Sequence, residues 1–235
     1  MLPIGASGLV FLVAALTGGC WAQLKPGCKV ETLRACGDDY VPYGNRPHLP
    51  ASGKEFEDEC TKQKRQIACS VEFINDCLSG LSKTAGVLAV RSLQGIVDDI
   101  CTDGSQSHKE YQKVVPCMNA AGSKLNACFQ GLKSGMQKAV AKAPPNEVVP
   151  HTCCAYGEMV DCVGRALDTC EGGKEFLLRI FDRAFGKVLG LVCGQHTRGS
   201  EACKALPKLP SLGPKDRKID NYLELLAEAA ATFEQ

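Results

Sequence analysis

The sequence predicts an all-α fold, made of two tandem three-helix units cross-linked by disulfides and followed by a C-terminal amphipathic helix. Three observations support this prediction. Apolar residues recur at steps of three, four or seven along several stretches, which is helical spacing, and strand-like alternation does not dominate anywhere. The 235 residues include 15 cysteines. Most of these cysteines fall into two successive series with nearly the same spacing.

The first 22 residues have the pattern of a signal peptide. A short apolar stretch from Gly8 to Leu16 is followed by small residues, and Cys20-Trp21-Ala22 offers a cleavage site before Gln23. The stretch is too short for a transmembrane helix. It departs from the signal-peptide pattern in one respect, because its leading region lacks Lys and Arg. Cleavage would leave 14 cysteines, an even number that suits a fully oxidised protein. We therefore expect secretion into the extracellular space.

The spacing of the mature cysteines indicates an internal duplication. Subtracting the first series from the second gives offsets of 89, 92, 93, 93, 93 and 92 residues. The two series are Cys28, Cys36, Cys60, Cys69, Cys77, Cys101 and Cys117, Cys128, Cys153, Cys162, Cys170, Cys193. This predicts a first six-Cys unit over 23–105 and a second over 106–205, which holds the additional pair Cys154 and Cys203. The alternative is that helical spacing alone aligns the cysteines.

Each unit is expected to contain three helices. In the first unit these are a short helix over Cys28–Cys36, a long one over Lys54–Ser79 and a third over Lys83–Cys101. The long helix is apolar on two sides, so it should be central and packed by two neighbours. Ser52 and Glu55 match a capping box at its start.

The second unit repeats this order, with helices over Cys117–Ala143, His151–Glu171 and Glu175–Cys193. Two prolines, Pro144 and Pro145, should end the first of them. Residues 206–235 form a proline-rich linker and a terminal helix, because the stretch from Asp216 to Gln235 is amphipathic, with Phe233 among its apolar residues. That helix either binds a partner or caps a ligand, or it docks on the protein's own core.

The geometry of antiparallel helices favours one disulfide pattern. Residues equidistant from a turn lie side by side, and an intact helix would hold Cys77 and Cys101 about 30 Å apart, too far for a bridge. Both units then join their first cysteine to the fifth, the second to the fourth and the third to the sixth. The seven predicted bridges are Cys28–Cys77, Cys36–Cys69, Cys60–Cys101, Cys117–Cys170, Cys128–Cys162, Cys153–Cys193 and Cys154–Cys203.

Composition and motifs argue against several classes of function. The net charge of +1 is unlike that of a strongly basic nucleic-acid binder, and no apolar run is long enough for a membrane span. The motifs G-x-S-x-G and H-E-x-x-H and the P-loop are absent, so we expect no enzyme and assign no catalytic residue. None of the four histidines stands at metal-ligand spacing with another, so we expect no metal and no cofactor.

The overall pattern resembles the insect haemolymph glycoproteins, a family of arthropod secreted cysteine-rich helical proteins. The features that carry the resemblance are the signal peptide, about 200 mature residues, Cys153-Cys154 near the middle and the C-x7-C spacings. Helical six-Cys domains of nematode secreted proteins are a second likeness. The chain departs from the glycoprotein pattern because it lacks an N-x-[ST] sequon. The resemblance implies a soluble extracellular protein with a carrier or immune-related role.

These observations predict a secreted, disulfide-stabilised, non-enzymatic binding protein of extracellular fluid, with a small apolar ligand or an extracellular protein as partner. For a carrier, Phe176, Ile180, Phe181 and Phe185 would line a cavity where helical units meet; otherwise they are simply core. The alternative is a host- or cell-directed interaction factor of the salivary, venom or immune type. Such a factor would act through the terminal helix or through the loop between Cys36 and Cys60, which otherwise only connects two helices.

Overall fold

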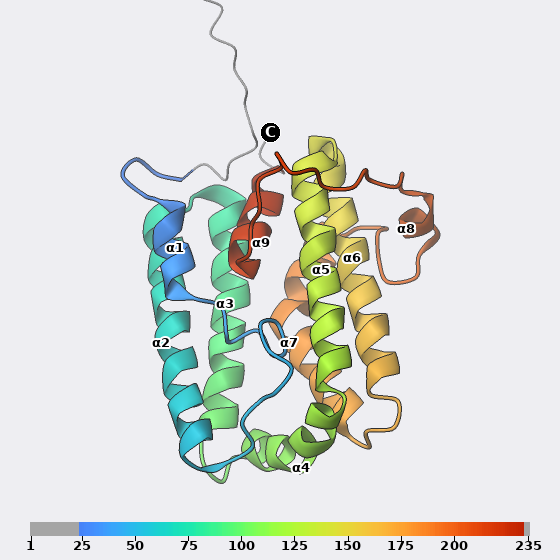
Figure 1. Ribbon diagram of the computed structural model, residues 1–235. Coiled ribbons are helices and arrows are strands. Elements are labelled where there is room, and N and C mark those ends of the chain that lie inside the picture. Colours follow the sequence, from blue (N-terminus) through green and yellow to red (C-terminus); the bar gives the residue numbers. More distant parts are fainter. Residues whose placement is uncertain (1–23, 233–235) are drawn as a thin grey trace, which may run out of the picture.

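Antiparallel helices form two groups that pack against each other, with the terminal helix between them (Figure 1). The computed structural model describes residues 24–232, and over that range it contains nine helices and no strand. This confirms the predicted all-α, disulfide-rich fold. The helices are α1 (Val30–Cys36), α2 (Gly53–Cys77), α3 (Gly80–Cys101), α4 (Gln106–Ala120), α5 (Gly122–Lys142), α6 (Pro145–Ala166), α7 (Gly173–Val192), α8 (Glu201–Ala205) and α9 (Tyr222–Ala231). The predicted signal peptide over 1–22 and Phe233 lie outside the described residues.

The three helices of the first unit form close to their predicted positions. The capping box predicted at the start of α2 does not form. Ser52 precedes the helix in an extended conformation, but its side chain makes no capping hydrogen bond.

In the second unit, the predicted helix over Cys117–Ala143 is two helices. The chain leaves helical geometry at Ala121, and α4 begins well upstream, where the Ser105 hydroxyl accepts a hydrogen bond from the His108 N–H at 2.9 Å. The break brings the chain against the loop before α2: a Cβ atom on Gly122 would lie 1.8 Å from the Pro47 carbonyl oxygen. This close contact between distant segments is what sequence periodicity could not reveal.

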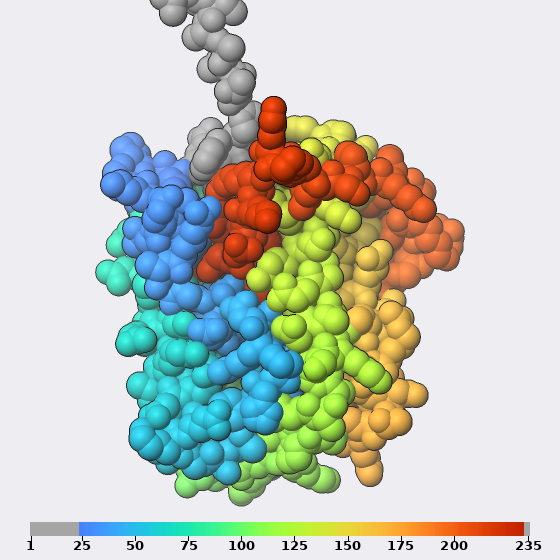
Figure 2. All heavy atoms as spheres, in the orientation of Figure 1, coloured from blue at the N-terminus to red at the C-terminus, as the bar shows by residue number. Residues whose placement is uncertain are grey.

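The segment between α1 and α2 packs on the core as a connector. It covers the front of the molecule between α2 and α5 (Figure 2). Tyr43 is fully buried, with φ of 59°, and its hydroxyl donates to the Asn119 side chain at 3.0 Å. The same Asn119 side chain accepts from the Leu49 N–H and donates to the Leu49 carbonyl oxygen. The tyrosines that an exposed recognition loop would present, including Tyr40, are therefore core residues.

The two halves of the chain share their core. One apolar cluster is built mainly on α4 to α7 but includes Tyr43, Leu49 and Phe56 from the first half. A second cluster is built on α1 to α3 and includes Ala184 of α7 and Leu223 of α9. Because side chains from both halves meet in the same clusters, neither half buries its apolar surface alone.

Seven disulfides cross-link the helices, and their Cα atoms lie 5.5–5.8 Å apart, within the usual range for bridged cysteines. They join the seven pairs that the helix spacing favours, from Cys28–Cys77 to Cys154–Cys203. None of these bridges links the first half of the chain to the second, and none lies beyond Cys203. The contact between the halves and the position of α9 therefore depend on non-covalent packing.

Candidate functional site: an apolar cavity beneath the terminal helix

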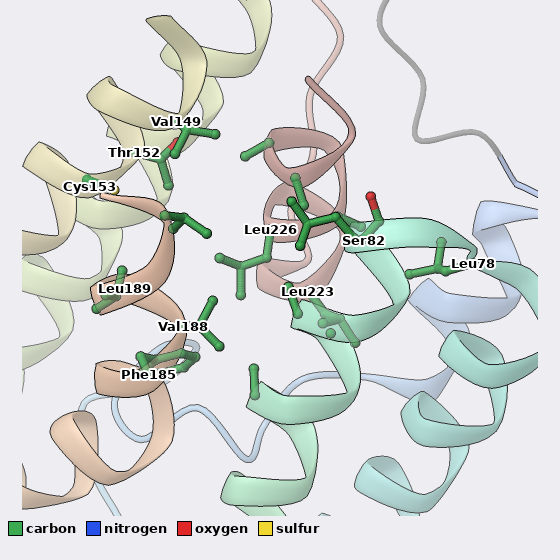
Figure 3. Close-up of a pocket in the computed structure, with 18 residues that line it drawn as sticks. Leu78, Ser82, Val149, Thr152, Cys153, Phe185, Val188, Leu189, Leu223 and Leu226 are labelled. Atoms are coloured by element: carbon green, nitrogen blue, oxygen red, sulfur yellow. The ribbon is translucent and has the colours of Figure 1, made fainter. Parts of the chain in front are cut away.

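The terminal helix closes one side of an apolar cavity. On α9, Leu223, Ala227 and Ala230 recur at helical spacing and line the cavity, whose other lining residues come mainly from α3, α6 and α7. Figure 3 shows Leu223 and Leu226 of α9 beside this space. The cavity between these helices has a volume of about 90 Å³. Its lining residues are Leu78, Leu81, Ser82, Ala85, Gly86, Ala89, Val149, Thr152, Cys153, Phe185, Val188, Leu189, Val192, Leu223, Leu226, Ala227, Ala229 and Ala230.

A second cavity adjoins the first, and a third adjoins the second. A cavity of about 80 Å³ shares Ala89, Phe185 and Leu223 with it, among other residues, and extends between α3, α5 and α7. A third, of about 60 Å³, shares Leu93 and Ile180 with the second. Together they approach the lower end of the range of ligand pockets, which begins at roughly 300 Å³.

The lining of the first cavity carries no ionisable side chain. Thr152 is one of its two hydroxyl residues, and its Oγ1 donates to the Val148 carbonyl oxygen at 2.9 Å, which satisfies that hydroxyl within α6. Cys153 is tied to Cys193 in a disulfide. What the site offers is therefore mainly apolar surface.

The second cavity also contains tyrosines, and burial keeps them neutral. Desolvation raises the pKa of Tyr40 to about 12 and raises the pKa values of Tyr156 and Tyr222 well above the ordinary value. The Tyr222 hydroxyl donates to the Phe129 carbonyl oxygen at 2.9 Å, and the Tyr40 hydroxyl lies 3.2 Å from Ser70 Oγ. These hydroxyls serve the protein's own hydrogen bonds.

Buried ion pairs hold α9 in place. Glu224 and Glu228 have side chains that are 2% and 3% exposed. Arg34 of α1 donates from Nε and Nη2 to the Glu224 carboxylate at 2.7 and 2.8 Å, and this hydrogen bonding raises the pKa of the Arg34 guanidinium. Arg217 in the linker donates to both carboxylates, at 2.5 Å to Glu224 and 2.8 Å to Glu228.

The start of α9 is also fixed by hydrogen bonds. The Asn221 side chain accepts from the Glu224 N–H at 3.0 Å as an N-cap, and the Tyr222 N–H donates to Asp38 Oδ2 at 2.8 Å. Of the two alternatives for the terminal helix, the structure shows docking on the protein's own core, with most of the helix buried. In that position the helix also covers the cavity.

The four residues predicted to line a ligand cavity differ in which of the three cavities they line. Phe185 lines the first and second cavities, Phe181 lines the second, and Ile180 lines the second and third. Phe176 touches only the third and packs in the core near Tyr111. Sequence reasoning missed the lining from α3, where Ala85, Gly86 and Ala89 leave the space, because small residues in an apolar helix give no distinctive signal.

Within residues 24–232, no group of three or more His, Cys, Asp or Glu side chains is placed to hold a metal ion. Over the same range, no helix is both long and apolar enough to cross a membrane.

Comparison with known proteins identifies one family. Residues 51–193, well over half of the chain, match the family model described as "Protein of unknown function (DUF1397)". No curated protein and no solved structure matches the chain.

Proposed function

The chain belongs to the DUF1397 family of unknown function, and we propose that it is a secreted, non-enzymatic carrier that binds a small apolar ligand beneath α9. The observation that supports this proposal most directly is the set of adjoining cavities, whose first member is lined by eighteen residues without an ionisable group. Burial of apolar surface in such a site contributes roughly 25 cal/mol per Å² of ligand surface removed from water.

The cavity size is consistent with this role. Dry apolar cavities of about 150 Å³ lined by Leu, Ile and Phe bind small hydrocarbons such as benzene. Here cavities of about 90 and 80 Å³ adjoin each other. An alkyl or aryl group of moderate size could occupy both, and α9 would exclude water from it.

An extracellular location is supported by the disulfides and by the leader pattern at 1–22. Seven bridges suit an oxidising compartment, because cytosolic reductants keep thiols reduced. The resemblance of the sequence to the insect haemolymph glycoproteins supports haemolymph as the fluid in which this carrier acts.

A fluorescent probe that brightens in apolar surroundings, N-phenyl-naphthylamine, tests the carrier. The purified protein should bind it saturably. Ala85→Phe fills the first cavity from α3 and should weaken binding by about tenfold, equivalent to about 1.4 kcal/mol. Gln94→Phe adds the same side chain on the exposed face of α3 and should bind like the wild type.

Both variants should be shown by circular dichroism and urea unfolding to be folded before binding is compared. Lack of saturable binding by the wild type would contradict the carrier. Equal binding by the two folded variants would contradict the position of the site. Native mass spectrometry after mild purification offers a second readout, since a carrier should retain an apolar molecule.

A further inference from the structure

A polar cleft lies along the contact between α3 and α7, outside the cavities. Its volume is about 540 Å³. The residues that line it are Arg91, Ser92 and Gly95 of α3, and Asp182, Arg183, Gly186 and Lys187 of α7. Two of the lining residues, Gly95 and Gly186, have no side chain, and a Cβ atom on Gly95 would lie 3.4 Å from Arg183 Nη2.

The residues that line this cleft carry a net positive charge. Three cations, Arg91, Arg183 and Lys187, face a single lining carboxylate, Asp182. Arg183 is partly neutralised from outside the lining, because its Nη1 donates to Asp99 Oδ2 at 2.6 Å. In the described part of the chain, neither Arg91 nor Lys187 forms an ion pair. The cleft can therefore accept an anion without losing an existing contact of these two side chains.

The cleft and the apolar cavity lie against the same pair of helices. On α7, Lys187 of the cleft precedes Val188 of the cavity, and Gly186 follows Phe185. On α3, Ser92 is three residues from Ala89, a rise of about 4.5 Å along the helix axis. Phe185 and Val188, which line the cavity, are therefore chain neighbours of Gly186 and Lys187, which line the cleft.

We propose that the ligand is an amphiphile with an anionic head, whose apolar tail occupies the cavity beneath α9 and whose head group binds Arg91 and Lys187 in the cleft between α3 and α7. This inference rests on the proposed carrier function and specifies its ligand. The cavity alone would accept any apolar molecule of suitable size. The unpaired cations favour a carboxylate, because an ionised oxygen acceptor gains a charge-assisted contact there that a hydroxyl does not.

Decanoate and decanol form a matched pair of ligands, since they have the same tail and differ in the head. Their affinities can be measured by displacement of N-phenyl-naphthylamine near pH 7.5, where the carboxylate is ionised. The wild type should bind decanoate at least fivefold more tightly than decanol. The double variant Arg91→Gln/Lys187→Gln should lose this preference, because each exposed cation contributes about a two- to fivefold effect. Added salt should weaken decanoate binding alone.

The matched control is Lys109→Gln/Lys113→Gln, which removes the same charge from the exposed surface of α4 and should retain the preference. Decanol binding reports whether the cleft variant still folds around its cavity. Equal affinities for decanoate and decanol in the wild type would overturn the anionic head while leaving the carrier intact. A cleft variant that binds decanol like the wild type and keeps the full preference for decanoate would also overturn it. Failure of both ligands to displace the probe would overturn the carrier itself.

Discussion

Substitution of Arg34 by methionine tests how α9 is held on the cavity. The Arg34 guanidinium makes two hydrogen bonds, of 2.7 and 2.8 Å, to the buried Glu224 carboxylate. Methionine retains an apolar side chain of similar length but removes both bonds. Glu224 keeps its bond to Arg217 at 2.5 Å, so its charge stays partly compensated.

The magnitude follows from the geometry. Hydrogen bonds to charged groups contribute about 1.5–3 kcal/mol. Arg34 is 40% exposed, so solvent screening reduces the expected loss to about 1–2 kcal/mol. Because no disulfide described here lies beyond Cys203, the loss should appear as local opening of α9 rather than as global unfolding. The open population of α9 should rise about 5- to 30-fold.

Hydrogen–deuterium exchange of the intact chain measures this opening. Peptides that cover α9 should exchange faster by that factor, whereas peptides from α5 and α6, which the Cys128–Cys162 bridge links, should not change. Arg65→Met is the matched control, since Arg65 is exposed on α2 and forms no ion pair within the described residues. Unchanged exchange in α9, or an equal increase throughout the molecule, would refute the reasoning.

Three further predictions concern stability and covalent structure. Gly122→Ala should lower the free energy of unfolding by about 2 kcal/mol or more, because the added Cβ would overlap the Pro47 carbonyl. Gly131 is exposed and has open space around it, so Gly131→Ala should raise the free energy of unfolding by about 0.5–1 kcal/mol. Equal urea midpoints for these two variants of α5 would contradict this. Burial lowers the pKa of His151, so the unfolded chain binds more protons and stability should fall as pH drops below about 6.5. His151→Gln should flatten that dependence in urea titrations between pH 5 and 7, and exposed His48→Gln should leave it unchanged. Peptide mapping without reduction should recover the seven bridges, and free thiols in the purified protein would contradict them.

The residues that sequence reasoning placed well are those whose neighbours are set by local periodicity. Apolar spacing along α2 and α7 predicts long helices, and helical rise limits which cysteines can meet. The equal C-x7-C spacings predict the bridges Cys28–Cys77 and Cys36–Cys69, and both form. The turn at Gly80 predicts that Cys60 faces Cys101, and this bridge forms as well.

The candidate site was predicted only in part. Phe181 and Phe185 stand on the apolar stripe of α7, so they were natural candidates for a lining. The lining from α3 was not predictable, because whether Ala85 and Ala89 face a void or a neighbour depends on helices distant in the chain. The cationic cleft was missed for the same reason, since Arg91 and Lys187 lie about a hundred residues apart.

The sequence by itself determined the helical class, the two cysteine series and the disulfide connectivity within each half. These features depend on apolar periodicity and on the short distance that a disulfide can span. Only the tertiary structure decided that the chain breaks between α4 and α5, that α9 docks on its own core and that space remains beneath it. Each of these features depends on contacts between distant segments: the Pro47 carbonyl against Gly122, and Arg34 against Glu224. Such contacts form only when the whole chain packs, so local residue patterns do not predict them.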